Sequence, residues 1–398
     1  MHPLWDTATI MTSVAIKGFR IRTLQLGMGW FPEERGGVNR FYYDLLRYLP
    51  QVGVDVRGLV AGSSKVAHAS GGNVQAFAPP AVPVFKRWWA VRRMVLRALA
   101  EDEISLVVSH FALYTFPVID VIRSRPLVVH FHGPWALEAK VEVNRRLNTL
   151  IPNFVERVVY RRGTRFIVLS NAFRDVLHRH YRVPPERIRV VPGGVDVNRF
   201  TPDLTRWEAR ERLGLPQDRP IVLTVRRLVR RVGLEDLLAA LDRVRKRVPE
   251  VLLLVVGTGP LAGALSDRVK SLGLKNNVRL LGFVPDQDLP ATYRAADLTV
   301  VPSITFEGFG LVVVESLAAG TPALVTPVGG LPEVVGDLSP GLVLPATGVG
   351  PLSEGLAEVL TGGSTLPSAE ACQAYARERY DWPRIAARVR EVYSEALH

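Results

Sequence analysis

A short apolar stretch, then a glycine-bearing loop and a helix, recurs along this chain, and that repeated unit constrains the fold most. Apolar stretches of strand length that alternate with helices predict parallel sheets covered by helices on both faces. Residues 61–83, rich in Gly, Ser, Ala and Pro, are predicted to be loop. The predicted strands are 19–26, 54–60, 105–110, 127–131, 165–169, 188–191, 221–225, 251–256, 278–281, 298–301 and 322–326.

A Pro- and Gly-rich segment, Pro192 to Pro202, separates two halves, and the strand–loop–helix pattern restarts after it. Domain boundaries fall in such segments, and 398 residues suffice for two domains of ordinary size. We predict an α/β fold of two doubly wound domains, over residues 1–195 and 196–382. The last helix carries an apolar stripe on one face, so residues 383–398 are expected to pack back on the N-terminal domain.

The excess of positive charge of the chain lies entirely in its first half. Residues 1–195 carry 27 Lys and Arg against 14 Asp and Glu, whereas residues 196–398 carry 23 against 24. An anionic membrane surface, a phosphorylated lipid or a nucleic acid would account for this excess, and so would a general use of arginine on solvated faces.

A basic helix is predicted over Phe85 to Ala100, where two tryptophans lie next to five Lys and Arg residues. Such a helix can lie in a lipid headgroup layer. An ordinary helix that packs on the sheet through its 94–99 face is the alternative.

The remaining composition favours a cytoplasmic protein that is peripheral at a membrane at most. The single cysteine, Cys372, excludes an intramolecular disulfide and a cysteine-rich metal site. No apolar run reaches the length of a membrane span, and residues 1–18 lack the pattern of a secretory signal.

Two carboxylates, Glu307 and Glu315, lie eight positions apart after the predicted strand 298–301. The loop and helix between them can bring both carboxylates to one ligand. Gly308 and Gly310 allow backbone N–H groups at the helix N-terminus to approach phosphate or sugar oxygens. A plain strand–loop–helix unit with solvated glutamates is the alternative.

Histidines end two predicted strands of the first half, at His110 and in His130-Phe131-His132-Gly133. Ligands of open parallel sheets bind at the carboxyl ends of strands, so His132 is well placed to meet a substrate. His130 lies inside its strand and is expected to be structural. No third ligand lies near this pair in the sequence, so we predict no metal site there.

These motifs, in their order and spacing, resemble the retaining nucleotide-sugar glycosyltransferases of family 4. The resemblance spans nearly the whole chain and implies the GT-B fold, in which two Rossmann-like domains face a central cleft. It rests on Gly36-Gly37, His132-Gly133, Pro192-Gly193-Gly194-Val195-Asp196, Arg227-Leu228, Gly257-Thr258-Gly259-Pro260, Glu307 with Glu315, Gly329-Gly330 with Glu333, and Tyr380-Asp381-Trp382.

The resemblance implies a role for each matching position. Glu315 would hold the ribose hydroxyls of the nucleotide, and backbone groups of Phe283 and Val284 would meet its base. His132 would contact the donor sugar near the reacting carbon. The remaining donor-binding groups are Glu307, which would hold sugar hydroxyls, the loop glycines Gly36, Gly37 and Gly257, and the amides of Phe309, Gly310 and Leu311.

The implied reaction is transfer of a hexosyl group from a UDP- or GDP-sugar to a glycan, lipid-linked or small-molecule acceptor. His132, Arg227 and Glu307 would be the catalytic residues. Arg227 and backbone amides can stabilise the charge of the leaving phosphate, so neither a metal nor a cofactor is expected. Because the leaving phosphate can act as the base, Glu307 and Glu315 are not interpreted as a hydrolase pair.

One position departs from the family pattern. A lysine is usual where this chain has Val232, and it would pair with the diphosphate. Arg230 or Arg231 can supply this charge, with Arg231 the expected donor ligand, or phosphate binding relies on Arg227 alone.

Two other functions are compatible with parts of this pattern. A nucleotide-sugar 2-epimerase shares the fold, although we identify no acid and base set for a sugar C2. A non-catalytic protein that binds an anionic surface through its basic half is the second alternative, and the Glu307 and Glu315 pair argues against it. No nucleic-acid partner is expected, and the donor and acceptor are not determined by the sequence.

Overall fold

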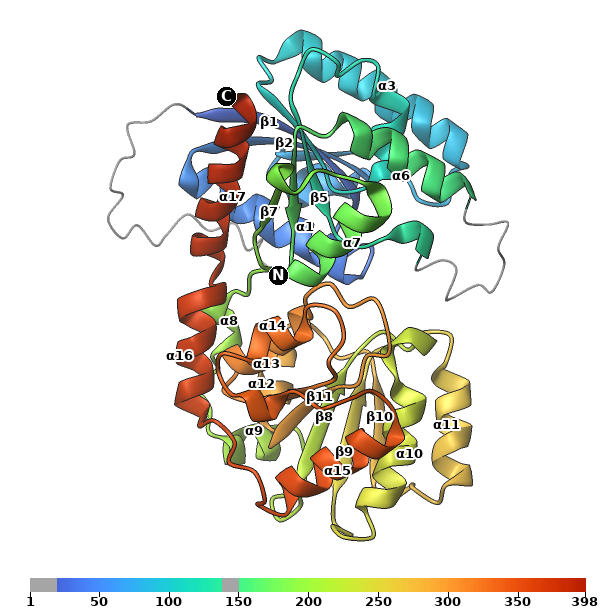
Figure 1. Cartoon of the computed structure of the whole chain (residues 1–398), viewed down its shortest axis with the longest axis vertical. Coiled ribbons are helices and arrows are strands. Elements are labelled where there is room, and N and C mark those ends of the chain that lie inside the picture. Colours follow the sequence, from blue (N-terminus) through green and yellow to red (C-terminus); the bar gives the residue numbers. More distant parts are fainter. Residues whose placement is uncertain (1–19, 138–149) are drawn as a thin grey trace. The chain divides into compact units, whose positions relative to one another are not determined.

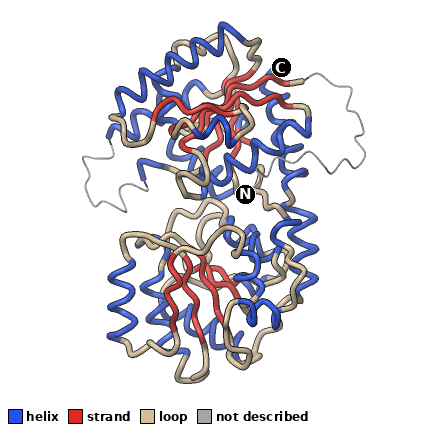
Figure 2. The backbone as a smooth tube through the Cα atoms, turned by 180° about the vertical axis from the view of Figure 1, so that it is seen from behind, coloured by secondary structure: helices blue, strands red, loops and turns tan. Residues whose placement is uncertain are grey.

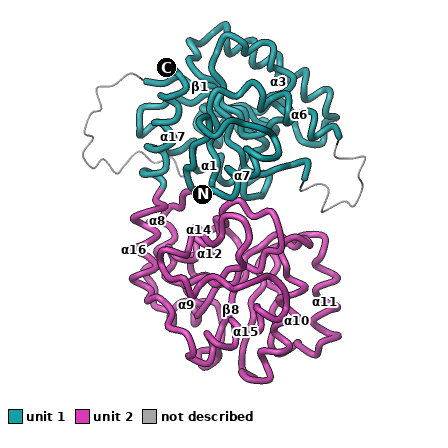
Figure 3. The backbone as a smooth tube through the Cα atoms, in the orientation of Figure 1, with its two compact units in different colours: residues 1–140, 145–192, 382–398 teal, residues 141–144, 193–381 magenta. Residues whose placement is uncertain are grey.

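The computed structural model describes residues 20–137 and 150–398, and these form two compact units. Among the described residues, unit 1 comprises 20–137, 150–192 and 382–398, and unit 2 comprises 193–381 (Figure 3). The division thus falls three residues before the boundary that we placed at Val195.

Unit 1 is built on a parallel sheet of seven strands in the order β3-β2-β1-β4-β5-β6-β7 (Figures 1 and 2). The strands are β1 (Ile21–Gly29), β2 (Val54–Ala61), β3 (Val74–Ala78), β4 (Leu106–Ser109), β5 (Leu127–Phe131), β6 (Arg165–Val168) and β7 (Ile188–Val190). The helices are α1 (Gly37–Tyr48), η1 (Leu49–Val52), α2 (Lys65–Ala69), α3 (Val84–Glu101), α4 (Ala112–Thr115), η2 (Phe116–Val118), α6 (Leu150–Arg162), α7 (Asn171–Tyr181), η4 (Pro185–Arg187) and α17 (Trp382–Leu397).

Unit 2 repeats the plan with a parallel sheet of five strands in the order β10-β9-β8-β11-β12. The strands are β8 (Ile221–Val225), β9 (Leu252–Val256), β10 (Val278–Gly282), β11 (Leu298–Val301) and β12 (Ala323–Val325). The helices are α8 (Val197–Phe200), α9 (Arg206–Arg212), η5 (Arg230–Val232), α10 (Leu234–Val244), α11 (Ala262–Ser271), α12 (Leu289–Arg294), α13 (Leu311–Ala318), α14 (Leu331–Val335), η6 (Pro340–Leu342), α15 (Val349–Leu360) and α16 (Ala369–Tyr380).

Four inner strands of the two sheets are buried along their whole length. Every residue of β4, β5, β9 and β11 is buried. Strands covered by helices on both faces need such continuous apolar runs, which is why these runs identified the strands in the sequence. The predicted doubly wound α/β fold is therefore confirmed.

Strand β3 and helix α2 lie in the segment 61–83, which we predicted as loop, so that prediction was wrong. β3 is an edge strand that pairs only with β2. Only Val74 and Phe77 of its five residues are buried. An edge strand needs no continuous apolar run, and therefore its sequence resembled the loop around it.

Helix α17 belongs to unit 1, although it ends the chain. The Trp382 ring lies edge-on to the Phe41 ring of α1, with ring centroids 5.4 Å apart. Its apolar stripe is buried, including Ile385 and Val389. Tyr393 reaches the middle of the sheet and bonds to His130 of β5.

Each sheet reverses its strand order once. In unit 1 the chain passes from β1 to β2 and β3, and β4 then lies on the other side of β1; in unit 2, β11 likewise lies on the other side of β8. The loops that leave the two central strands diverge at such a point, which creates the usual ligand crevice of doubly wound sheets.

Candidate active site

An ion pair joins the ends of the two central strands of unit 2. Arg226 follows β8 and Glu307 lies in the loop after β11, with Nη2 and Oε2 2.5 Å apart. Both side chains are largely buried, at 8% and 13% exposed. The Ser303 hydroxyl accepts a hydrogen bond from Arg226 at 3.0 Å and donates one to Glu307 at 3.1 Å.

Glu307 is ionised in this environment. Burial alone would raise the pKa of its carboxyl, but the charges of Arg226 and Arg231 and the bond from Ser303 outweigh burial and lower the pKa below its usual value. Arg231 also donates to the backbone carbonyl of Phe306 at 3.2 Å. The loop thus presents a fixed carboxylate between two guanidinium groups.

The two neighbouring arginines after β8 differ in position. Arg226, which we did not single out from the sequence, is partly buried and holds Glu307. Arg227 is exposed, and no described residue bonds or pairs with its side chain. Its guanidinium therefore stays available to an anionic ligand.

Two glycines allow neighbouring loops to close over this pair. A Cβ at Gly257, where φ is +134°, would lie 1.8 Å from the backbone oxygen of Arg226. A Cβ at Gly329 would lie 1.8 Å from the backbone oxygen of Glu307, which accepts a bond from the Gly330 amide at 2.9 Å. The loops therefore need a glycine at position 257 in order to pack, whatever ligand the site binds.

Helix α13 begins in the same loop, with Gly310 at its N-cap in the left-handed region at φ +85°. Phe306 also has a positive φ, +48°, which is uncommon for an aromatic residue and marks a constrained loop. The Phe309 side chain is buried against Tyr380. Phe309 therefore offers a ligand only its backbone, next to the unpaired first-turn amides that a helix N-terminus supplies, Leu311 among them.

Glu315 lies one turn further along α13 and is partly buried. Its Oε2 accepts a hydrogen bond at 2.9 Å from the hydroxyl of Tyr293, a fully buried residue of α12. Tyr293 thus fixes the rotamer of Glu315. Phe283 is 47% exposed and Val284 partly exposed, directly after β10.

Val232 is a core residue of unit 2. It is 2% exposed and belongs to the same apolar cluster as Leu228 and Leu234. A lysine ammonium at this depth would lose its hydration, so the valine here stabilises the loop after β8 rather than a ligand.

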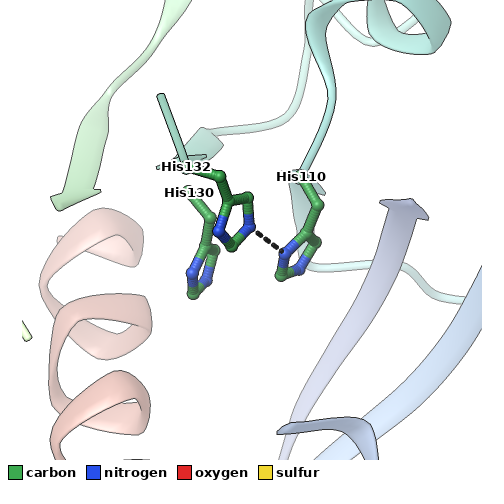
Figure 4. A group of neighbouring side chains, drawn as sticks. All are labelled: His110, His130 and His132. Atoms are coloured by element: carbon green, nitrogen blue, oxygen red, sulfur yellow. Dashed lines mark hydrogen bonds between the residues drawn. The ribbon is translucent and has the colours of Figure 1, made fainter. Parts of the chain in front are cut away.

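In unit 1, His110 and His132 bond to one another at the carboxyl ends of β4 and β5, with Nδ1 and Nε2 3.2 Å apart (Figure 4). His130 bonds instead to the Tyr393 hydroxyl at 2.9 Å. Burial lowers the pKa of all three imidazoles, that of His132 to about 4. All three are therefore neutral at neutral pH, and the structural role expected of His130 matches its contacts.

His110 supplies a third imidazole beside this pair, although no third ligand lies near the pair in the sequence, so distance along the sequence was a wrong reason to exclude a metal site. One nitrogen from each ring lies within 4.8 Å of the others. The rings are nearly parallel, however, with interplanar angles of 17–20°. A metal binds in the plane of each imidazole, and nearly parallel planes do not converge, so the geometry is that of a hydrogen-bonded cluster.

A buried carboxyl holds the turn that follows His132. Glu156 of α6 accepts bonds from the backbone amides of Trp135 at 3.0 Å and Ala136 at 3.3 Å, and from the Tyr181 hydroxyl at 2.8 Å. Burial raises the pKa of this carboxyl to about 7. Sequence patterns gave no signal for Glu156.

Gly36 and Gly37 begin α1 and are exposed, and a Cβ at either would meet no atom within 4 Å. The buried Asn39 side chain ties this loop together, since it accepts from the Gly29 amide at 3.1 Å and donates to the Glu34 carbonyl at 3.0 Å. The start of α1 is thus open to a ligand and fixed in shape.

Comparison with family models divides the chain at nearly the same place as its structure. Residues 35–199 match the model described as Glycosyltransferase Family 4, and residues 205–379 match the model described as Glycosyl transferases group 1.

Two curated relatives are similar over part of their length. A GDP-mannose-dependent alpha-(1-6)-phosphatidylinositol monomannoside mannosyltransferase of Mycolicibacterium smegmatis is 34% identical over 53% of this chain and 57% of its own. A D-inositol 3-phosphate glycosyltransferase of Corynebacterium aurimucosum is 33% identical over 68% of this chain and 66% of its own. The chain spans about half to two thirds of the length of the curated relatives it matches.

Solved structures share the fold over nearly the whole chain. Sucrose-phosphate synthase from Thermosynechococcus elongatus superposes with a TM-score of 0.80 at 23% identity, over 94% of this chain and 99% of its own. Anabaena Alr3699/HepE in complex with UDP-glucose gives a TM-score of 0.76 at 23% identity, over 94% of this chain and 100% of its own.

Proposed function

The chain belongs to the group 1 glycosyl transferases of family 4, and on this premise we propose that it transfers a hexosyl group from a nucleoside-diphosphate sugar to an acceptor hydroxyl, with retention at the anomeric carbon. The observation that carries the proposal is the ionised Glu307, fixed by Arg226 beside the start of α13. A carboxylate next to a helix N-terminus supports this function, because the first can accept bonds from sugar hydroxyls and the second favours an anion.

Unit 2 binds the nucleotide part of the donor. Glu315 accepts hydrogen bonds from the ribose hydroxyls, and Tyr293 holds it in place for this. The diphosphate meets the amides that start α13, together with the exposed Arg227 and with Arg231. Backbone groups of Phe283 and Val284 contact the base. In unit 1, the open amides of Gly36 and Gly37 contact the phosphates, and His132 contacts the transferred sugar.

The reaction needs no group beyond those of the chain and its substrates. The bond from the anomeric carbon to the phosphate oxygen breaks, and the bond to the acceptor oxygen forms on the same face of the sugar. The acceptor proton passes to the departing phosphate oxygen. Arg227 and the backbone amides stabilise the charge on that phosphate, so the proposed transfer is independent of a metal.

We propose an acceptor that carries phosphate, either free or in a lipid. The excess positive charge of residues 1–195 supports this, and so do the names of two relatives, which refer to inositol phosphate and to phosphatidylinositol.

A lipid source is supported by the outer face of unit 1. Helix α3 packs on the sheet through Val91, Val95 and Ala98, and Met94 and Leu99 pack against the same core, so the 94–99 face does lie on the sheet. Six of the exposed residues of α3 form what we call the α3 outer face, namely Phe85, Lys86, Trp89, Arg93, Leu96 and Arg97. Nearby, the exposed Phe154 of α6 lies edge-on to Phe116 of η2, whose ring also contacts Trp88 of α3. No helix in the described part of the chain is both long and apolar enough to span a membrane.

A thermal-shift panel of GDP, UDP and ADP, followed by product analysis with the matching sugar donors, tests the proposed reaction. We expect one nucleoside diphosphate to raise the unfolding midpoint by mass action. We also expect its sugar donor to release that diphosphate equally with and without a chelator. An epimerised nucleotide sugar as the product would support the 2-epimerase instead, and no binding of any of the three would contradict the proposal.

A further inference from the structure

Gln25 of β1, His110 after β4 and His132 after β5 form one hydrogen-bond chain in unit 1. Gln25 Oε1 lies 2.9 Å from His110 Nε2. His110 Nδ1 lies 3.2 Å from His132 Nε2, and this second bond is drawn in Figure 4. Gln25 is fully buried and His110 is 2% exposed, whereas His132 is partly exposed. The chain therefore runs from the interior to a surface that a ligand can reach.

The orientation of the Gln25 amide follows from its bond to Thr23, and its nitrogen also lies 3.4 Å from the Tyr393 hydroxyl. Thr23 donates the one proton of its hydroxyl to the backbone carbonyl of Asp55 at 2.8 Å. Thr23 Oγ1 can then only accept a bond from Gln25, whose partner atom at 3.0 Å must be the amide nitrogen. The amide oxygen of Gln25 consequently faces His110, and His110 must donate its Nε2 proton to that oxygen.

The proton positions of the two imidazoles follow in turn. Burial lowers the pKa of His110 well below its ordinary value, so the ring is neutral and carries one proton. Since that proton lies on Nε2, His110 Nδ1 carries no proton and accepts a hydrogen bond from the Nε2–H group of His132. His132 is neutral as well, so its Nδ1 is also bare. No described residue forms a hydrogen bond with His132 Nδ1.

We propose that Gln25 and His110 are positioning residues that hold His132 in its Nε2–H tautomer, so that His132 Nδ1 accepts a hydrogen bond from a hydroxyl of the transferred sugar. The assignment of this ligand rests on the proposed function, whereas the tautomer follows from the hydrogen bonds of unit 1. A sugar hydroxyl can donate to a bare nitrogen, but a deoxy carbon cannot. The chain of bonds is thus a specificity device, because a donor that lacks this hydroxyl leaves His132 Nδ1 without a partner.

Nitrogen-15 NMR of the full-length protein, labelled at histidine, reads the tautomer directly. We expect the His110 and His132 rings to be neutral with the proton on Nε2 at pH 7.5, with signals assigned from His110→Gln and His132→Gln variants. A His132 signal with the proton on Nδ1 overturns the inference, and this measurement on the unmutated chain does not depend on how any other variant folds.

A Gln25→Met variant removes the acceptor for His110 at similar side-chain volume. We expect a mixture of His132 tautomers, a loss of about tenfold in kcat/KM for the sugar donor, and unchanged affinity for the nucleoside diphosphate. The activity ratio between the full donor and deoxy-sugar donors should narrow. Gln75→Met, at an exposed position of β3, is the matched control and should match the unmutated chain.

The outcomes separate the two proposals. Turnover by the unmutated chain together with full activity in Gln25→Met overturns the positioning role alone. No turnover with any nucleotide sugar overturns the proposed function, and with it the sugar hydroxyl as the ligand, whatever tautomer is observed.

Discussion

Arg226, and not its neighbour Arg227, forms the buried ion pair with Glu307 at the ends of β8 and β11. Removal of one partner leaves the other charge buried and uncompensated, which costs about 3–5 kcal/mol. We therefore expect Arg226→Ala to lower the free energy of unfolding by about this amount, measured by urea denaturation. Arg227→Ala should change it by no more than about 0.5 kcal/mol, because its side chain is exposed.

The Arg227→Ala variant, which should keep its stability, is the one expected to lose ligand binding. Arg227→Ala is expected to weaken nucleoside diphosphate binding and to abolish transfer while it leaves the fold intact. Isothermal titration of the folded variant measures this. Unchanged affinity and activity in Arg227→Ala would remove Arg227 from the phosphate site and leave Arg231 as the nearby cation.

Val232→Lys tests why the usual lysine is missing. The side chain at this position is 2% exposed in the core of unit 2, so the ammonium must either lose its hydration or displace its apolar neighbours. We expect the free energy of unfolding to fall by roughly 2–4 kcal/mol, with no gain in nucleoside diphosphate affinity. Val232→Ile is the control for volume. A stable lysine variant with tighter binding would mean that the position does face the phosphates.

Sequence reasoning found the parts of the fold that burial imposes on residue type. The central strands, such as β9, are continuously apolar because both faces are covered. It failed where burial is partial, as in the edge strand β3. The sequence also did not distinguish Arg226 from Arg227. The apolar pattern of β8 ends at Val225, so it does not indicate which of the two arginines contacts the loop after β11.

The candidate site was predictable where a motif lies within one segment. Glu307 and Glu315 lie on one strand–loop–helix unit, and their spacing was visible. The bond between His110 and His132, in contrast, depends on the pairing of β4 with β5. Likewise, Tyr293 meets Glu315 only because α12 packs on α13. Such contacts between elements leave no periodic signal in a single sequence.

Tyr293→Phe tests the role of Glu315. The substitution removes one hydroxyl from a buried ring and frees Glu315 Oε2 from a 2.9 Å hydrogen bond. We expect nucleoside diphosphate affinity to fall about threefold to tenfold because Glu315 is less well oriented, with a stability loss of about 1 kcal/mol. A control with Tyr375→Phe removes a comparable bond, to the Val334 carbonyl in the same unit. Equal affinities in both variants would contradict a ribose-binding Glu315.

Two kinds of buried group in unit 1 make the free energy of unfolding depend on pH, and they do so in opposite directions. His110, His130 and His132 have lowered pKa values, so below pH 6.5 the unfolded chain binds protons that the folded chain does not, and stability falls on acidification. Glu156, with its pKa raised to about 7, retains a proton in the folded chain between pH 4.5 and 7, so its contribution falls as pH rises. The two effects oppose one another between pH 5 and 6.

Glu156→Gln should remove the opposing contribution. The slope of the unfolding free energy against pH between 5 and 6 should then become steeper by about 1.4 kcal/mol per pH unit, which is the effect of one proton. Urea denaturation at pH 5.0, 5.5 and 6.0 measures both slopes. An unchanged slope would mean that Glu156 is ionised throughout this range in the folded chain.

Binding of the α3 outer face to an anionic lipid surface is tested by co-sedimentation with vesicles. Trp89 is 64% exposed, and the Arg93 guanidinium lies 5.0 Å from the centroid of its ring, so one position offers both an apolar group and a cation to a headgroup layer. We expect the chain to sediment with phosphatidylserine vesicles at low salt, to bind neutral vesicles weakly, and to be released at high salt.

Trp89→Ser should weaken binding by roughly fivefold or more, since it removes most of the apolar area at this point. Trp207→Ser, at a 62% exposed position of unit 2, should have no effect. Equal losses in the two variants would show that any exposed tryptophan serves, and no sedimentation at low salt would favour a free phosphorylated acceptor over a lipid.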